Sequence, residues 1–193
     1  MVRGMVNPEI HAYYEHGFEQ DRLVGGRQRI EFLRVWDLLE RHLPPPPAQI
    51  LDIGGGAGAY AVPLYHLTSK ADRIAALREA RRAARPGGLI IAKALSRFYP
   101  VFENLTDDMG SEPGDFAATA RFLTDGQYRN DTGDPAKFTT SYFHRPEELT
   151  SEIQEADLEL RLLAAASGPV KLLAGTARRL EDPAQREYLL SAL

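Results

Sequence analysis

The stretch that decides the fold is Ile50-Leu51-Asp52-Ile53-Gly54-Gly55-Gly56-Ala57-Gly58, an apolar run that ends in alternating glycines. Apolar residues surround Asp52, as they do in a buried parallel strand that stops where the glycines begin. The glycines let the backbone turn sharply and approach a ligand, because no Cβ stands in the way. This pattern is typical of the strand-to-helix turn of nucleotide-binding α/β folds. The alternative is a glycine-rich turn that binds nothing.

The sequence on either side of this loop predicts one right-handed βαβ unit. Residues 49–53 form its first strand, residues 71–84 an amphipathic helix, and residues 89–94 a second buried parallel strand. Pro86-Gly87-Gly88 ends the helix and turns the chain. Strand, glycine loop, helix and strand in this order predict a parallel α/β core.

Helices are expected on both sides of this core. Residues 8–43 predict a short helix, a break at Gly25-Gly26 and then an amphipathic helix over residues 30–43 that covers one sheet face. Pro44 to Pro47 form a stiff connector. The C-terminal part predicts four helices, at residues 98–109, at 116–123, at 146–156 and from 182 on. It also predicts one further strand at 158–163 and a polar loop at 125–135.

Length and composition limit the class of protein. A chain of 193 residues with 44% hydrophobic and 26% charged residues suits one globular domain over residues 1–193. We expect this domain to have N-terminal helices at 8–43, its core at 48–95 and acceptor-side helices and loops at 96–193. The net charge of −4 gives no reason to expect nucleic acid or an anionic membrane as a partner. No cysteine is present, which excludes disulfides and thiolate chemistry. Without a signal-peptide pattern or a long apolar run, we expect a cytoplasmic protein.

Two motifs carry a resemblance to a known family. Asp-x-Gly-x-Gly-x-Gly at residues 52–58 resembles motif I of the class I S-adenosylmethionine (SAM) dependent methyltransferases, and Arg85-Pro86-Gly87-Gly88-Leu89 resembles the segment before that family's fifth strand. Residues 21–34 and 139–149 resemble a bacterial subgroup of the family. The likeness covers most of residues 8–165. It implies a shortened Rossmann-like methyltransferase fold with SAM as cofactor, in which Asp52 orients the methionine end and Gly54, Gly56 and Gly58 pass under the cofactor.

The chain departs from the family in one place. In the family a helix and three further strands separate the glycine loop from the segment like Tyr65-His66-Leu67, whereas here only residues 59–64 lie between them. Six residues cannot hold a helix and a strand. The missing part would carry the acidic residue that binds the ribose hydroxyls, and this sequence has no counterpart of it. The shortened sheet would leave apolar edges unpaired, so we expect a homodimer, one form of which exchanges elements between chains.

Methyl transfer from a sulfonium needs little catalytic machinery beyond alignment of the acceptor and, in some cases, a base. His66 and His144 are the candidate bases, because imidazole titrates near neutral pH, and each is equally well explained as a hydrogen-bonded structural histidine. Tyr14, with Tyr13, could close over the cofactor, although helix packing explains both tyrosines as well.

Other chemistries are disfavoured. Three arginines could hold an anionic acceptor but are also common surface residues: Arg97, Arg129 and Arg145. No spacing of histidines and carboxylates indicates a metal site.

Two functions remain open. The first is a SAM-dependent methyltransferase acting on a small-molecule acceptor. The second is a catalytically silent methyltransferase-like protein that binds SAM weakly or not at all and serves as an oligomerising or interaction module. A dehydrogenase-like domain is disfavoured, because G-x-G-x-x-G is missing and Asp52 precedes the glycines.

Overall fold

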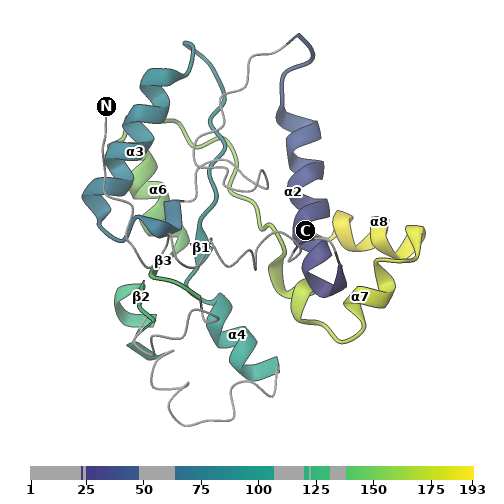
Figure 1. The fold of residues 1–193 in the computed structure, drawn as a ribbon. Coiled ribbons are helices and arrows are strands. Elements are labelled where there is room, and N and C mark those ends of the chain that lie inside the picture. Colours follow the sequence, from purple (N-terminus) through teal and green to yellow (C-terminus); the bar gives the residue numbers. More distant parts are fainter. Residues whose placement is uncertain (1–22, 24, 48–63, 107–119, 122, 131–137) are drawn as a thin grey trace.

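The computed structural model describes residues 23, 25–47, 64–106, 120–121, 123–130 and 138–193. In chain order these residues form short 3-10 helices (η), α-helices and strands: η1 (Gly26–Gln28), α2 (Arg29–His42), η2 (Leu64–His66), α3 (Lys70–Ala83), β1 (Leu95–Ser96), α4 (Tyr99–Thr106), β2 (Gln127–Tyr128), β3 (Ser141–His144), α6 (Pro146–Glu155), η4 (Gly168–Leu172), α7 (Thr176–Arg179) and α8 (Pro183–Ser191) (Figure 1). The chain thus combines helices with a small sheet. The strand predicted at 49–53, the glycine loop and the first helix after Pro8 lie outside the described residues.

The small sheet is mixed, in the order β1-β3-β2. β1 runs parallel to β3, with Leu95 opposite Phe143, and β2 runs antiparallel to β3, with Gln127 opposite Tyr142. All four residues of the central strand β3 are buried. Because side chains alternate along a strand, Tyr142 and His144 lie on one face of β3, and Phe143 lies on the other.

The helices α3 and α6 form where their sequences predict helices. α3 buries Ile74 and Leu77 from its apolar stripe, and Arg81 and Arg82 lie in its last turn, where the helix dipole favours cations. α6 begins with Pro146 in its first turn, and the Glu148 carboxylate accepts a hydrogen bond from the backbone N–H of Arg145 at 3.0 Å.

The helix predicted from residue 182 on is also present. Asp182 caps α8, since its Oδ1 accepts from the backbone N–H of Gln185 at 2.9 Å, and Pro183 follows in the first turn. The helix predicted at 98–109 is described as α4, over Tyr99–Thr106. Of the helix predicted at 116–123, residues 120, 121 and 123 are helical, and the rest lie outside the described residues.

The described residues contain two separate hydrophobic clusters. One joins α2 to the C-terminal elements through Ile30, Val170, Leu180 and Leu189. The other joins η2, α3 and the end of α6 through Leu64, Ile74, Leu77 and Ala156. Figure 1 shows the corresponding arrangement, with α3, α6 and the sheet on one side and α2, α7 and α8 on the other.

Three expectations about the core are wrong. Residues 88–92 are not in a strand, and β1 starts only at Leu95. Leu89 and Ile91 are 40% and 39% exposed, so this apolar run is not the buried strand that its composition suggested. Residues 158–163 also form no strand, and Leu162 and Leu163 are 53% and 48% exposed. A run of apolar residues shows only that the segment is hydrophobic, whereas a strand also needs a partner strand at hydrogen-bonding distance.

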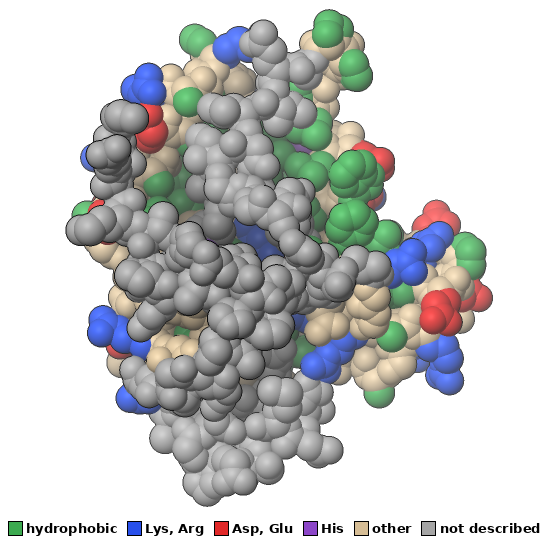
Figure 2. All heavy atoms as spheres, in the orientation of Figure 1, with side chains coloured by type: hydrophobic (Ala, Val, Ile, Leu, Met, Phe, Trp, Pro, Cys, Tyr) green, Lys and Arg blue, Asp and Glu red, His purple; other side chains and the backbone are tan. Residues whose placement is uncertain are grey.

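The third correction concerns the helix predicted over residues 30–43. It is present as α2, but it packs mainly against η1, η4 and α8 and not over the sheet. Its aromatic residues Phe32 and Trp36 stack at 6.2 Å and are 42% and 54% exposed. Hydrophobic side chains gather on the α2 side of the face drawn in Figure 2.

None of the described helices combines the length and the apolar character that crossing a membrane requires.

Candidate functional site

A group of charged and polar side chains, all buried except the half-buried Glu148, lies on the Tyr142 face of β3. We call this group the ionic cluster; it consists of Arg73, Arg97, Tyr142, His144, Glu148 and Glu152. Its members come from α3, β3, α6 and the turn after β1. The helices therefore meet this face of the sheet through charges and not through an apolar layer.

Arg73 and Glu152 form the centre of the ionic cluster. Arg73 Nε donates to Glu152 Oε2 at 2.8 Å and its Nη2 donates to the other carboxylate oxygen, with both side chains 2% exposed. The remaining guanidinium nitrogen of Arg73 donates to the carbonyl oxygens of Leu67 and Thr68, each at 2.9 Å. The guanidinium also lies 3.6 Å from the centre of the Tyr142 ring, a cation–π contact.

The neighbours of Glu152 keep it ionised. Burial alone would raise its pKa, but hydrogen bonds from Arg73 and His144, together with their charges, lower the pKa to about 2. The carboxylate can therefore only accept hydrogen bonds at neutral pH.

This fixes the tautomer of His144. Its Nε2 lies 3.2 Å from Glu152 Oε2, so Nε2 carries the proton and donates it. The other ring nitrogen, Nδ1, is buried and makes no hydrogen bond among the described residues. With its side chain 2% exposed, His144 is enclosed by protein.

Arg97 forms the second half of the ionic cluster. It donates to the Tyr142 hydroxyl at 3.0 Å, to the carbonyl oxygen of Phe143 at 3.1 Å and to the Glu148 carboxylate. Tyr142 in turn donates to Glu148 at 3.2 Å. Burial raises the pKa of Glu148, but the backbone N–H of Arg145 and the Arg97 guanidinium outweigh this and lower it overall. Burial and the Glu148 charge raise the pKa of Tyr142.

The backbone at Gly126 approaches this cluster closely. Gly126 has φ of +76°, and a Cβ placed there would lie 2.5 Å from Arg97 Nη2 and 2.6 Å from the carbonyl oxygen of Phe143. Its own carbonyl accepts from the backbone N–H of Phe143 at 2.8 Å. Only glycine combines this left-handed conformation with so little space.

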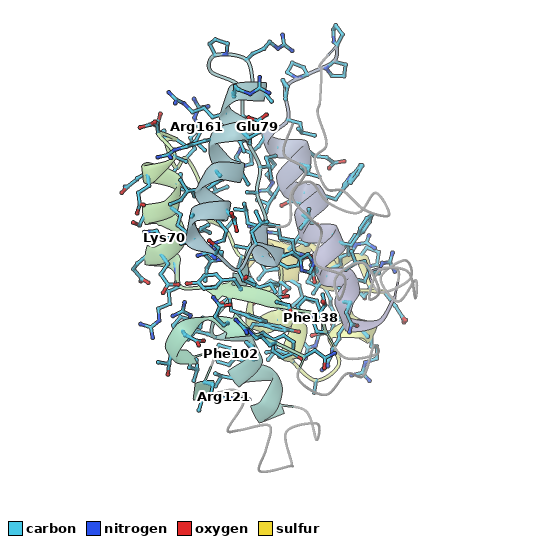
Figure 3. The ribbon with its side chains drawn as sticks, turned by 60° about the vertical axis from the view of Figure 1, so that its left-hand side comes forward. Lys70, Glu79, Phe102, Arg121, Phe138 and Arg161 are labelled. Atoms are coloured by element: carbon cyan, nitrogen blue, oxygen red, sulfur yellow. The ribbon has the colours of Figure 1, made fainter. Side chains whose placement is uncertain are left out.

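A second group, the aromatic cluster, consists of Tyr65, His66, Tyr128, Phe138 and Phe143. Its rings come from η2, β2, β3 and the chain just before β3. Phe143 is buried, and the other members are half-buried. Figure 3 shows Phe138 well apart from Lys70, which begins α3.

His66 also has an assigned tautomer. Its Nδ1 lies 3.3 Å from the carbonyl oxygen of Thr140, and a carbonyl only accepts hydrogen bonds. Nδ1 therefore carries a proton.

The sequence-predicted site residues have different outcomes. The proposed cofactor residues Asp52, Gly54, Gly56, Gly58 and Tyr14 lie outside the described residues, as does Tyr13. The two candidate bases lie in different surroundings, His66 in the aromatic cluster and His144 in the ionic cluster.

The three arginines considered for an anionic acceptor differ in exposure and in contacts. Arg97 is 2% exposed and its guanidinium is held by protein groups, so it serves the ionic cluster. Arg145 is exposed and donates to the carbonyl oxygen of Leu123 at 3.2 Å. Arg129 is exposed on the chain that follows β2.

Sequence reasoning missed Arg73 and Glu152. Arg73 interrupts the apolar stripe of α3 beside Ile74, and Glu148 and Glu152 lie one helical turn apart on α6. A charged residue within an apolar stripe was the available signal, but its partner could not be named from sequence.

Comparison of the chain with protein-family models, with curated proteins and with solved structures found no significant match of any of the three kinds. Among the described residues, no group of three or more histidines and carboxylates could hold a metal ion.

Proposed function

We propose that this chain is a SAM-dependent methyltransferase that acts on a small-molecule acceptor. The observation that carries the proposal is the spacing Asp52-x-Gly54-x-Gly56-x-Gly58 directly after an apolar run. When bound, SAM supplies a methyl group already activated on a sulfonium. Asp52, the three glycines and Tyr14 would hold it.

His66 is the base in this proposal. Its ring is half-buried, and its Nδ1 donates to the carbonyl oxygen of Thr140 at 3.3 Å. His144, in contrast, is enclosed and bonded to Glu152. We therefore assign His144 a structural role in the ionic cluster.

One observation favours the second candidate, a catalytically silent methyltransferase-like protein. The buried carboxylates of the described part are Glu31, 6% exposed, and Glu152, 1% exposed. Each is paired with a cation, Lys93 and Arg73 respectively. Neither is therefore placed to replace the carboxylate that binds the ribose hydroxyls in the family. A chain without such a replacement would bind SAM weakly and act as an oligomerising module.

The proposal extends to assembly as a homodimer. The extended segments at 88–92 and 158–165 carry exposed apolar side chains, including Leu89, Ile91, Leu162 and Leu163, and neither segment is in a strand. Segments that carry exposed apolar side chains favour pairing between chains.

Calorimetric titration with S-adenosylhomocysteine tests the cofactor role. Micromolar binding at about one molecule per chain supports the methyltransferase. Asp52→Ala should then weaken binding about tenfold or more, because a charged hydrogen-bonding group is lost. Asp72→Ala, at an exposed position on α3, is the matched control and should leave binding unchanged. No saturation at millimolar ligand would favour the silent protein.

A further inference from the structure

We infer that one face of α2 is a self-complementary docking surface, on which α2 of a second copy of this chain packs in antiparallel orientation. The inference rests on the homodimer of the proposed function, because it names the helix through which the two chains meet.

α2 is apolar on two faces. Ile30 lies on the face that packs into the C-terminal hydrophobic cluster. Phe32 and Trp36, one turn apart on another face, are 42% and 54% exposed, and their rings stack with centres 6.2 Å apart. Leu39 and Leu43 continue this second face at helical spacing and are half-buried. We call the four residues of the second face the α2 stripe. In Figure 1 the second half of α2 extends beyond α7 and α8.

Two charges of opposite sign lie along the α2 stripe. Arg29 is the first residue of α2, and Glu40 lies eleven positions further on, in its last turn. An α-helix turns by about 100° per residue, so eleven residues make three turns and a remainder of about 20°. Arg29 and Glu40 therefore lie almost in line, on the same side of the α2 stripe.

Glu40 keeps its negative charge at this surface. The other carboxylate in this part of α2, Asp37, is bound by Arg34 and Arg41 of the same helix, each at 2.7 Å. Glu40 instead accepts a hydrogen bond from the indole N–H of Trp36 at 2.7 Å. Because the indole is neutral, this contact holds Trp36 beside Glu40 without neutralising the carboxylate.

The positions of these charges select the antiparallel orientation. When Phe32 of one copy meets Trp36 of the other, the two-fold axis passes at position 34, midway between them. Arg29 lies five positions before this point and Glu40 six positions after it. Arg29 of one copy therefore falls beside Glu40 of the other, to within the rise of about one residue, ~1.5 Å. The symmetry forms this ion pair twice.

A parallel pair would have the opposite effect. It would place Arg29 against Arg29 and Glu40 against Glu40, and like charges across an interface weaken it. The α2 stripe and its two charges thus complement a copy of themselves, but in one orientation only.

Sedimentation equilibrium of the full chain tests the apolar part of the contact. Trp36→Ala should raise the dissociation constant of the dimer about tenfold or more, because a central tryptophan commonly dominates such an interface. Tyr188→Ala is the matched control. It removes an aromatic ring that is 71% exposed on α8 and should leave the dissociation constant within twofold.

Charge reversal tests the orientation and changes only surface residues. Glu40→Arg alone, or Arg29→Glu alone, should raise the dissociation constant about threefold or more, because each places like charges together. The double variant restores opposite charges and should return to within twofold of the wild-type value. Glu187→Arg, the same charge change at an exposed position on α8, should have no such effect.

Cross-linking gives an independent measure of the orientation, since the natural chain has no cysteine. A mixture of Arg29→Cys chains and Glu40→Cys chains should form the mixed disulfide dimer under mild oxidation. Arg29→Cys chains by themselves should form little disulfide dimer. Efficient disulfide formation between two Arg29→Cys chains would indicate a parallel pair and overturn the inference.

The outcomes separate this contact from the rest of the proposal. A dimer that is weakened equally by Trp36→Ala and Tyr188→Ala would overturn the α2 contact. So would a dimer that responds to replacement of Leu162 and Leu163 but not to Trp36→Ala, and the homodimer itself would then stand. A monomer at every concentration would overturn both, whereas the methyltransferase is judged separately, by S-adenosylhomocysteine binding.

Discussion

Arg73 and Glu152 lie 79 positions apart in the sequence, yet two nitrogens of one guanidinium reach both oxygens of one carboxylate. The pair joins α3 to α6 beside the ring of Tyr142. Because both side chains are 2% exposed, water cannot replace either partner. The relative position of the two helices therefore depends on this contact.

Arg73→Met should lower the free energy of unfolding by about 3–5 kcal/mol, because it leaves the Glu152 charge buried without its main partner. Lys70→Met is the matched control. Lys70 pairs with Glu155 between the same two helices, but these side chains are 55% and 43% exposed, so the loss should be much smaller than that of Arg73→Met. Urea unfolding of both variants measures the difference. Equal losses would show that burial of the Arg73 pair is without consequence.

Stability should fall in acid because of Glu152. Its pKa is lowered from 4.5 to about 2 in the folded chain, so its contribution is fully present above about pH 4.5 and is lost as the pH falls toward 2. The lowered pKa of Glu148 acts in the same direction. Urea unfolding between pH 6 and pH 3, run at about half-unit steps, should show this decline. Glu152→Gln should flatten the curve; an unchanged slope in that variant would refute the assignment.

Gly126→Ala should destabilise the fold by about 2 kcal/mol or more, because the new methyl group would meet Arg97 and the Phe143 carbonyl in addition to adopting a left-handed φ. Gly87→Ala separates the two effects. Gly87 has φ of +75° but no atom within 4 Å of a Cβ, so only the conformational cost of about 1 kcal/mol applies. Thermal unfolding of the two variants should rank Gly126→Ala as clearly the less stable.

The proposed homodimer should appear in sedimentation equilibrium as a mass that rises with protein concentration. Replacing Leu162 and Leu163 by serine should shift the equilibrium toward monomer, because these exposed residues lie on a segment that is in no strand of the described part. Leu173→Ser, at a residue that is 56% exposed outside both extended segments, should leave it unchanged. A wild-type chain of monomer mass at every concentration would contradict the dimer.

The long helices could be predicted because their information is local. Ile74 and Leu77 recur at helical spacing on α3, and Pro146 and Asp182 mark the starts of α6 and α8. The strands could not be predicted in the same way. β2 lies within a stretch that reads as a polar loop, and its pairing depends on β3. The apolar runs at 89–94 and 158–163 failed for the converse reason, since residues 88–92 and 158–163 are in no strand and several of their apolar side chains are exposed.

In the candidate site, too, residue types could be identified from the local sequence, whereas their partners could not. His66 and His144 were identified as titratable residues near motifs, and their tautomers follow only from Thr140 and Glu152. Those partners lie elsewhere in the chain or on another element, so no local pattern names them. The contacts of Arg97 could not be predicted from the sequence either, because an arginine in an irregular segment is usually a surface residue. Only the structure shows that it donates to Tyr142 and Glu148.

The face of β3 that bears Tyr142 and His144 has a consequence for how this chain can vary. A layer of leucines tolerates many exchanges, because one apolar side chain can fill the space of another. A layer of buried ion pairs does not, because replacing one residue leaves the charge of its partner buried and unpaired. Positions 73 and 152, and likewise 97 and 148, should therefore change in pairs or not at all. In a library randomised at these four positions, folded members should show opposite charges or joint apolar replacement within each pair.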